Sequence, residues 1–108
     1  MFRELVTANR SYRRFLESET ISRQTLLELI DLARLSPSGA NKQALRYYVS
    51  CDAKQNERVF DALAWAAYFR DWAGPVAGER PSGYIVIVQD QANKMVSGID
   101  YGIAAQTI

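Results

Sequence analysis

An arginine-rich segment near the start of the chain, residues 9–15, has side chains suited to binding an anion. Those side chains are Arg10, Ser11, Arg13 and Arg14. Guanidinium groups match phosphate oxygens with paired hydrogen bonds, and a serine hydroxyl adds a further donor. The segment therefore predicts a phosphate clamp. Taken alone, an exposed arginine-rich turn with surface ion pairs is the more common outcome.

A second group of polar residues occupies positions 36–43, with the sequence Ser-Pro-Ser-Gly-Ala-Asn-Lys-Gln. It offers hydroxyl, amide and backbone groups, and we expect Gly39 to be able to adopt a positive φ. Neutral donors and acceptors of this kind suit a flat heteroaromatic ligand better than acid–base chemistry. The alternative is an ordinary turn between a helix and a strand.

The composition excludes several classes of site. The chain has 108 residues, no histidine and one cysteine. Without histidine, Ser-His-Asp triads, Cys-His dyads and histidine-bearing zinc sites are impossible, so we assign no catalytic side chain and no metal site. Cys51 has no partner for an internal disulfide, which favours a reducing, cytoplasmic location.

Charge and hydropathy narrow the range of partners. The 13 basic residues nearly balance the 12 acidic ones, giving a net charge of +1. Domains that bind nucleic acid are typically strongly basic, so no nucleic-acid partner is expected, including an RNA that would stack on Tyr12. The longest apolar run, residues 62–69, is far shorter than the ~20 residues of a membrane span. We expect residues 1–108 to form at most one domain, and we expect no membrane partner.

The spacing of apolar residues predicts the elements that position these groups. Helical spacing predicts helices over residues 2–8, 22–35, 55–69 and 91–108, and Ser22 is the expected N-cap of the second. Alternation predicts a strand over residues 45–51, with Cys51 pointing inward and Ser50 on the opposite side. Residues 84–88 are apolar without alternation, which predicts a central strand covered on both faces.

The last predicted helix has an unusual apolar surface. Asp90 is its expected N-cap, and its apolar residues are Met95, Val96, Ile99, Ile103 and Ile108. Asp100 is interpreted as a solvated or capping carboxylate rather than a catalytic one. Two strands offer too little surface to cover this helix, so we expect another chain or a further segment to bury it, and we expect the chain to be the front part of a longer fold.

Three motifs in this order resemble the FMN-dependent nitroreductase family: residues 10–15 (RSYRRF), 37–43 (PSGANKQ) and 100–106 (DYGIAAQ). Residues 64–66 and 74–81 are similar to a subgroup of that family. The resemblance implies an α+β fold, with a central, mostly antiparallel sheet flanked by helices, of which this chain supplies the first part. It also implies a homodimer that binds FMN at its interface and passes two electrons from NAD(P)H to a nitroaromatic, a quinone or a similar acceptor.

The resemblance also implies roles for individual residues. Arg10 and Ser11 would hold the FMN phosphate, and Arg13 would reach the phosphate or ribityl side and the N1/O2 edge of the flavin. The ribityl chain and the ring edge would be bound by Ser38, Asn41 and Gln43. We expect these residues to line one cavity. The alternative function is a non-enzymatic descendant of the family that keeps the scaffold and has lost the flavin.

Overall fold

A computed structural model describes residues 1–90, 92 and 99–108 of the chain. Its elements are α1 (Phe2–Ala8), α2 (Arg23–Arg34), a short 3-10 turn (Gly39–Asn41), β1 (Leu45–Ser50), α3 (Ala53–Asp61), β2 (Tyr84–Gln89) and α4 (Ile99–Thr107). Helices combined with an antiparallel strand pair confirm the predicted α+β class. The first two predicted helices and both predicted strands agree with the structure to within one or two residues at each end.

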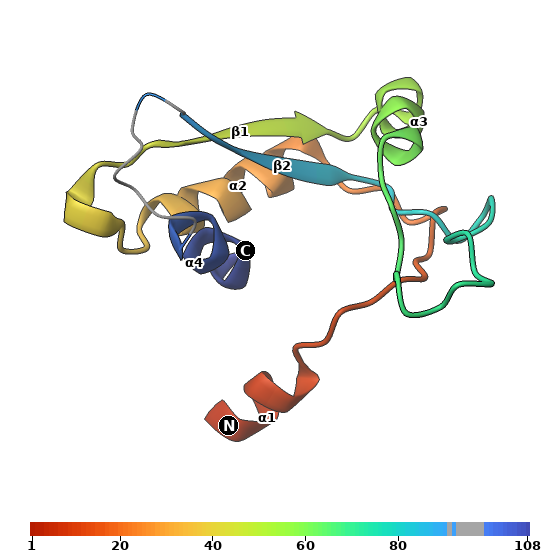
Figure 1. The fold of residues 1–108 in the computed structure, drawn as a ribbon, viewed down its shortest axis with the longest axis horizontal. Coiled ribbons are helices and arrows are strands. Elements are labelled where there is room, and N and C mark those ends of the chain that lie inside the picture. Colours follow the sequence, from red (N-terminus) through yellow and green to blue (C-terminus); the bar gives the residue numbers. More distant parts are fainter. Residues whose placement is uncertain (91, 93–98) are drawn as a thin grey trace.

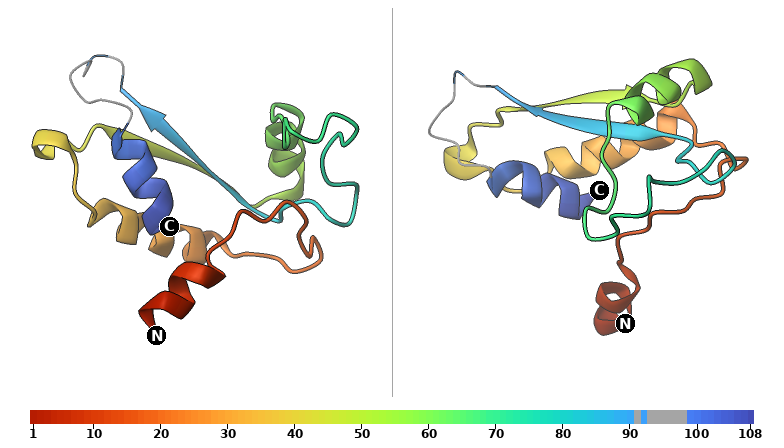
Figure 2. Two further views of the ribbon diagram at one scale, coloured as in Figure 1. Left: turned by 60° about the horizontal axis from the view of Figure 1, so that its bottom comes forward. Right: turned by 45° about the vertical axis from the view of Figure 1, so that its right-hand side comes forward.

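The two strands form the centre of the structure, and α2 and α4 pack together on one face of them (Figure 1; Figure 2). The register pairs Leu45 with Gln89 at one end and Ser50 with Tyr84 at the other. Among the described residues, few are buried to more than nine-tenths: Leu26, Ala33, Ala44, Ser50, Gly74, Pro75, Asp100 and Ala104. The helix α1 projects away from this body (Figure 1).

The start of α2 follows from its capping residue. The Ser22 hydroxyl accepts a hydrogen bond from the Thr25 amide at 3.0 Å, which satisfies one of the free N–H groups of the first turn. Leu26 is buried one turn later, beside Ile21. A Cβ placed on Gly83 would overlap the Ile21 side chain, so the absence of a side chain at Gly83 lets β2 approach the start of α2.

The alternation predicted for β1 holds only up to Val49. Arg46 and Tyr48 are exposed as expected, but Ser50 is fully buried, which corrects the prediction that it faces outward. Its hydroxyl donates to Asn56 Oδ1 at 2.6 Å, and Asn56 Nδ2 donates to the Ser82 carbonyl at 2.8 Å. Ser50 is therefore buried because Asn56 of α3 satisfies its polar group.

The prediction that β2 is covered on both faces is wrong for the described chain. Val86 and Val88 are 38% and 49% exposed, and Tyr48, which pairs with Val86, is 48% exposed. These side chains lie on the face of the strands opposite α2 and α4. The described residues therefore leave part of the apolar surface of β2 exposed.

The third helix is shorter than its apolar spacing predicts. It ends at Asp61, and residues 62–82 are irregular. Ala66 has a positive φ of 34°, which a helix does not allow. Trp65 instead packs against Phe60, with ring centroids 5.7 Å apart, and against Gly74, where an added Cβ would lie 2.7 Å from the indole. The tertiary packing of Trp65 therefore overrides the helical pattern.

The last helix is described only from Ile99, and Met95 and Val96 lie outside the described residues. The Asp90 carboxylate accepts a hydrogen bond from the Ala92 amide at 2.9 Å. Ile99 is 65% exposed and Ile103 is half-buried, so the described chain leaves part of this apolar surface uncovered. In the part of the chain that the structure describes, no helix is long and apolar enough to cross a membrane.

Candidate functional site

Residues 36–43 connect α2 to β1 and form the edge of a cavity of about 250 Å³. The cavity is lined by Ala33, Arg34, Ser36, Pro37, Ser38, Asn41, Gln43, Leu45, Tyr47 and Asp100. Three of the predicted site residues, Ser38, Asn41 and Gln43, therefore meet in one place. Burial raises the pKa of the Tyr47 phenol above its ordinary value, so Tyr47 stays protonated at neutral pH.

Internal hydrogen bonds hold this loop in an uncommon conformation. The Ser38 hydroxyl accepts from the Gln43 amide at 3.2 Å, and Gln43 Nε2 donates to Asn41 Oδ1 at 2.9 Å. Ala40, Asn41 and Gln43 have positive φ values of 49°, 53° and 51°. The positive φ expected at Gly39 thus occurs at its neighbours, where it costs about 1–2 kcal/mol per non-glycine residue. Other contacts must offset this cost.

One such contact comes from α4. Asp100 is 4% exposed, and its two carboxylate oxygens lie 3.0 and 3.2 Å from the Gly39 amide nitrogen, which donates to them. The carboxylate therefore caps the short turn from 61 residues away in the sequence. Of the two roles left open for Asp100, a solvated carboxylate is excluded by its burial, and the structure shows it accepting from a distant turn.

Arg10 and Ser11 lie elsewhere, at the end of α1. With Leu5, Val6, Asn9, Ala105 and Gln106 they line an open cavity of about 670 Å³ between α1 and the end of α4. The Arg10 guanidinium donates one long hydrogen bond, 3.5 Å, to the Asn9 carbonyl, and forms no ion pair with any described residue. Its remaining donors are therefore available to an anion.

Arg13 lines a third cavity, of about 470 Å³, together with Ser11, Tyr12, Arg14, Phe69 and Trp72. The Arg13 guanidinium donates to the Ser11 carbonyl at 3.3 Å, and no described carboxylate pairs with it. Arg14 differs, because it lies 3.6 Å from the Glu79 carboxylate across the same region. Arg13 thus has donors free for a ligand, whereas Arg14 has a structural partner.

The six predicted residues therefore do not line one cavity in the described chain, and that expectation is not met. The reason is visible in Figure 1, where α1 and the extended segment after it lead away from the body, on a different side from the turn at residues 39–41. Ser11 connects the second and third cavities, since it lines both. The site consists of two separate parts: a polar loop and an arginine-rich segment.

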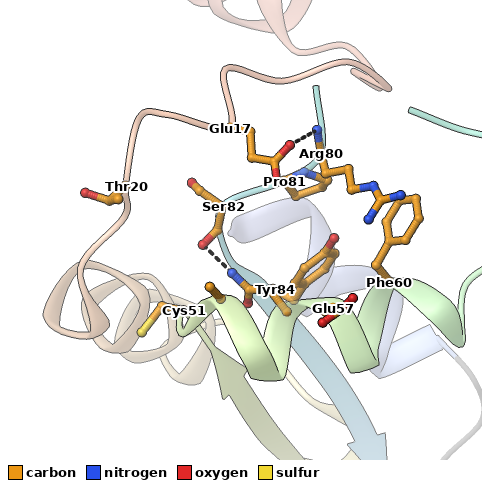
Figure 3. A pocket seen from close by; sticks show the side chains of 11 residues that line it. Glu17, Thr20, Cys51, Glu57, Phe60, Arg80, Pro81, Ser82 and Tyr84 are labelled. Atoms are coloured by element: carbon orange, nitrogen blue, oxygen red, sulfur yellow. Dashed lines mark hydrogen bonds between the residues drawn. The ribbon is translucent and has the colours of Figure 1, made fainter. Parts of the chain in front are cut away.

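A fourth cavity, of about 350 Å³, lies at the other end of the strands (Figure 3). The Arg80 guanidinium stacks on Phe60 at 4.1 Å from the ring centroid, and Glu17 accepts hydrogen bonds from the amides of Arg80 and Gly78. Burial and Glu17 raise the pKa of the Tyr84 phenol, and Arg80 opposes that effect. Cys51 is half-buried and lines this cavity, away from both parts of the predicted site.

This fourth cavity shows how the irregular segment is attached to the body. Glu17 joins the chain after the arginine-rich segment to residues 78–80, and Asn56 joins α3 to Ser82. The Arg80 Nε atom and the Tyr84 hydroxyl are buried without a hydrogen-bond partner in the described chain. The described residues contain no group of three or more potential metal ligands.

Sequence reasoning missed two contributors to these surfaces, Tyr47 and Gln106. Gln106 lines the cavity that contains Arg10, and Tyr47 lines the cavity that contains Asn41. A polar residue next to the apolar face of a predicted helix was the available signal for Gln106. Tyr47 fits the alternation of β1 as a core residue, so the sequence offered no signal that it borders a cavity.

A family model and two solved structures match this chain, and they agree with each other. The model of the nitroreductase family matches residues 6–108. A solved structure of an FMN-dependent nitroreductase from Clostridium difficile R20291 is 23% identical and superposes with a TM-score of 0.68, covering 97% of this chain and 51% of that one. A crystal structure of a candidate nitroreductase in complex with FMN, from Exiguobacterium sibiricum 255-15, is 25% identical with a TM-score of 0.60, covering 100% and 49%.

No curated protein matches the chain. The chain spans about half the length of the two solved structures, and it superposes on them over nearly all of its own length. The fold described above is accordingly the part of the nitroreductase fold that contains the strands β1 and β2 and their covering helices. From the match over residues 6–108, the chain belongs to the nitroreductase family.

Proposed function

We propose that this protein is an FMN-dependent oxidoreductase, as the solved structures similar to it are described as FMN-dependent or in complex with FMN. The observation that carries the proposal is the chemistry of the two parts of the site. The loop at residues 38–43 offers neutral donors and acceptors around a cavity, and Arg10 and Arg13 of the arginine-rich segment offer guanidinium donors without acidic partners in the described chain. A flavin mononucleotide requires both, because it combines a heteroaromatic ring with a phosphate.

In this proposal each group of residues binds a different part of FMN. Arg10 and Ser11 bind the phosphate, and Arg13 binds the phosphate or ribityl side and faces the N1/O2 edge of the ring. The groups that bind the ribityl chain and the ring edge are Ser38, Asn41 and Gln43. A fixed guanidinium near N1/O2 stabilises the negative charge of the reduced ring without a protein acid or base. Bound FMN supplies the acceptance and release of two electrons, so the chain needs no nucleophile of its own.

The active form in this proposal is a homodimer. Within one chain the loop and the arginine-rich segment lie on different sides, so a flavin at an interface joins the loop of one protomer to the arginine-rich segment of the other. The apolar surface of α1 supports this, because Phe2, Leu5 and Val6 are 80%, 64% and 54% exposed. Exposed apolar side chains on α1 and on Ile99 of α4 are suited to burial by a second copy.

NAD(P)H is the proposed electron donor, and a nitroaromatic, a quinone or a similar small molecule is the acceptor, in the cytoplasm. Both substrates react with the same flavin in turn. We therefore expect ping-pong kinetics, with parallel lines in double-reciprocal plots at several acceptor concentrations. Intersecting lines would contradict this order of binding.

An absorption spectrum of the purified full-length protein, followed by titration with FMN, tests the proposed cofactor. The proposal predicts flavin bands that remain with the protein through gel filtration. A folded protein that shows no bands and takes up no FMN would refute the proposal and favour the alternative, a scaffold that has lost the flavin. Riboflavin, which lacks the phosphate, is the matched control ligand and should bind more weakly.

A further inference from the structure

The buried carboxylate of Asp100 has a specific structural partner in the loop that the proposed function assigns to the flavin. Asp100 belongs to the first turn of α4 and is 4% exposed. Both of its oxygens accept from the Gly39 amide, at 3.0 and 3.2 Å. Asp100 also lines the cavity that contains Ser38, Asn41 and Gln43. It thus connects α4 to the proposed ring-binding loop.

The loop needs this connection because the Ser38 hydroxyl, which stands at the capping position, is used in another hydrogen bond. Ser38 stands at the N-cap of the short turn, but its hydroxyl makes no capping bond there. It accepts instead from the Gln43 amide at 3.2 Å. The Gly39 amide, at the start of the turn, is therefore left to Asp100. Without Asp100 this amide would lose its acceptor, and the positive φ values at Ala40, Asn41 and Gln43 would lose a contact that offsets their cost.

We propose that Asp100 is the positioning residue of the flavin loop: by accepting the Gly39 amide it fixes the conformation in which Ser38, Asn41 and Gln43 face the ligand. This inference rests on the proposed function. Asp100 acts through the loop backbone. Its effect therefore falls on the ring and ribityl end of the flavin, and the phosphate end depends on Arg10 and Ser11.

Two substitutions at Gly39 distinguish the loss of its amide N–H group from the addition of a side chain. Gly39→Ala keeps the N–H group, and an added Cβ would lie 3.6 Å from Asp100 Oδ1, an ordinary contact. Gly39→Pro removes the N–H group, yet proline is tolerated at the first position of a turn. Ser38 has φ −130° and ψ 151°, the extended conformation that a residue before proline prefers. The two variants differ mainly in the hydrogen bond to Asp100 and in the space the proline ring needs beside it.

The first readout is hydrogen exchange of the amides of Asn41, Lys42 and Gln43 in the full-length protein without flavin. These amides donate to Ser38 O, Gly39 O and Ser38 Oγ respectively. Asp100→Ala and Gly39→Pro should speed their exchange by about tenfold or more, whereas Gly39→Ala should not. Asp100→Asn keeps one acceptor oxygen and should restore most of the protection. Unchanged exchange in Asp100→Ala would overturn the inference.

The second readout is the affinity for FMN and for riboflavin. Asp100→Ala should lower both by the same factor, about tenfold to a hundredfold, because riboflavin keeps the ring and ribityl chain. In the Asp100→Ala background, Gly39→Pro should lower the two affinities little further, since the hydrogen bond from the Gly39 amide is already lost and the proline ring has room. A loss confined to FMN, or fully additive losses, would overturn the inference.

The two readouts keep the inference separate from the proposed function. Hydrogen exchange needs no flavin, so it decides whether Asp100 fixes the loop even if the wild-type protein binds no FMN. In that case the proposed cofactor is refuted by the titration, and the exchange rates still give a definite answer about Asp100. The unfolding midpoint of each variant controls for a general loss of stability.

Discussion

The body of the molecule and its N-terminal arm, residues 1–14, differ in how their functional groups are held. In the body, Asp100 and the hydrogen bonds within residues 38–43 fix the side chains that border the cavity. In the arm, every residue is exposed, and the Arg10 and Arg13 guanidinium groups donate only to neighbouring carbonyls among the described residues. One part of the proposed flavin site is therefore organised before the ligand binds, and the other is not.

This difference has an energetic consequence. The conformational cost of the loop is met when the protein folds, because its contacts are internal to one chain. The Arg10 and Arg13 side chains must be fixed by the ligand or by a second protomer, and this cost reduces the affinity for the flavin. The arm should therefore control flavin affinity through its charge and through dimerisation. The loop should control flavin affinity through its fixed shape.

Among substitutions in the arm, the removal of the Arg10 side chain should reduce FMN affinity the most. Arg10→Ala deletes charge-assisted hydrogen bonds to the phosphate, worth about 1.5–3 kcal/mol, or about tenfold to a hundredfold in FMN affinity. Riboflavin affinity should not change. Asn41→Ala is the matched loop variant and should weaken both ligands. Isothermal titration with the two flavins measures this, and an equal loss of riboflavin binding in Arg10→Ala would show that the arm does more than bind phosphate.

The free energy of unfolding, in contrast to FMN affinity, should depend on residues in the body and hardly on residues in the arm. Asn56→Ala removes the partner of the buried Ser50 hydroxyl and a donor to Ser82 O, so it should lower the free energy of unfolding by about 1–3 kcal/mol. Leu5→Ala in the arm should change the unfolding of the monomer by less than about 0.5 kcal/mol. Urea denaturation at a concentration where the protein is monomeric compares them. A large effect of Leu5→Ala there would mean that the arm packs on its own body.

Part of the alkaline pH dependence of stability should follow Tyr84 in the body, beside the contribution of Tyr47. The pKa of Tyr84 is raised by burial and by Glu17, so the folded state holds the phenol proton more tightly than the unfolded state. The resulting stability is fully present below about pH 10 and is lost as pH rises through the folded pKa. Tyr84→Phe should reduce this alkaline loss.

At neutral pH, Tyr84→Phe should leave stability unchanged or raise it by about 1 kcal/mol, because the buried hydroxyl has no partner in the described chain. Unfolding midpoints measured from pH 7 to alkaline pH, with the wild-type protein as control, test both statements. A clear destabilisation at neutral pH would show that the hydroxyl has a partner in solution.

The smallest effect is expected at Cys51. It lines the cavity around Arg80 and Glu17 and belongs to neither part of the proposed site. Cys51→Ala should leave flavin affinity and steady-state turnover unchanged. A flavin-loaded, folded variant with reduced turnover would place the chemistry at the other end of the strands.

Local signals in the sequence predicted much of this fold. The Ser22 cap, the helical spacing of α1 and α2 and the alternation in β1 each depend on a few neighbouring residues, and the structure follows them. The failures involve distant partners. Trp65 ends the helical pattern by packing on Gly74, and Ser50 is buried because Asn56 binds it. Spacing along the chain contains no information about these contacts.

The same limit applies to the site. The sequence predicted which residue types bind a phosphate and a flat ring, and the structure does bring Ser38, Asn41 and Gln43 together. It could not predict that the arm leads away from the loop, because that path depends on the packing of residues 15–21 and 78–83. The sequence left Asp100 as either a solvated or a capping carboxylate, and it could not identify a partner that lies 61 residues away.

A mixed-dimer experiment most directly tests the central claim that each flavin site joins the arm of one protomer to the loop of the other. Full-length Arg10→Ala and Asn41→Ala proteins are given different affinity tags, refolded together, and the mixed dimer is purified. If the parts come from different protomers, each mixed dimer regains one site of wild-type FMN affinity, whereas neither parent has any. If arm and loop of the same protomer form the site, every site in the mixed dimer has one substitution and no high-affinity binding returns, which would contradict the account.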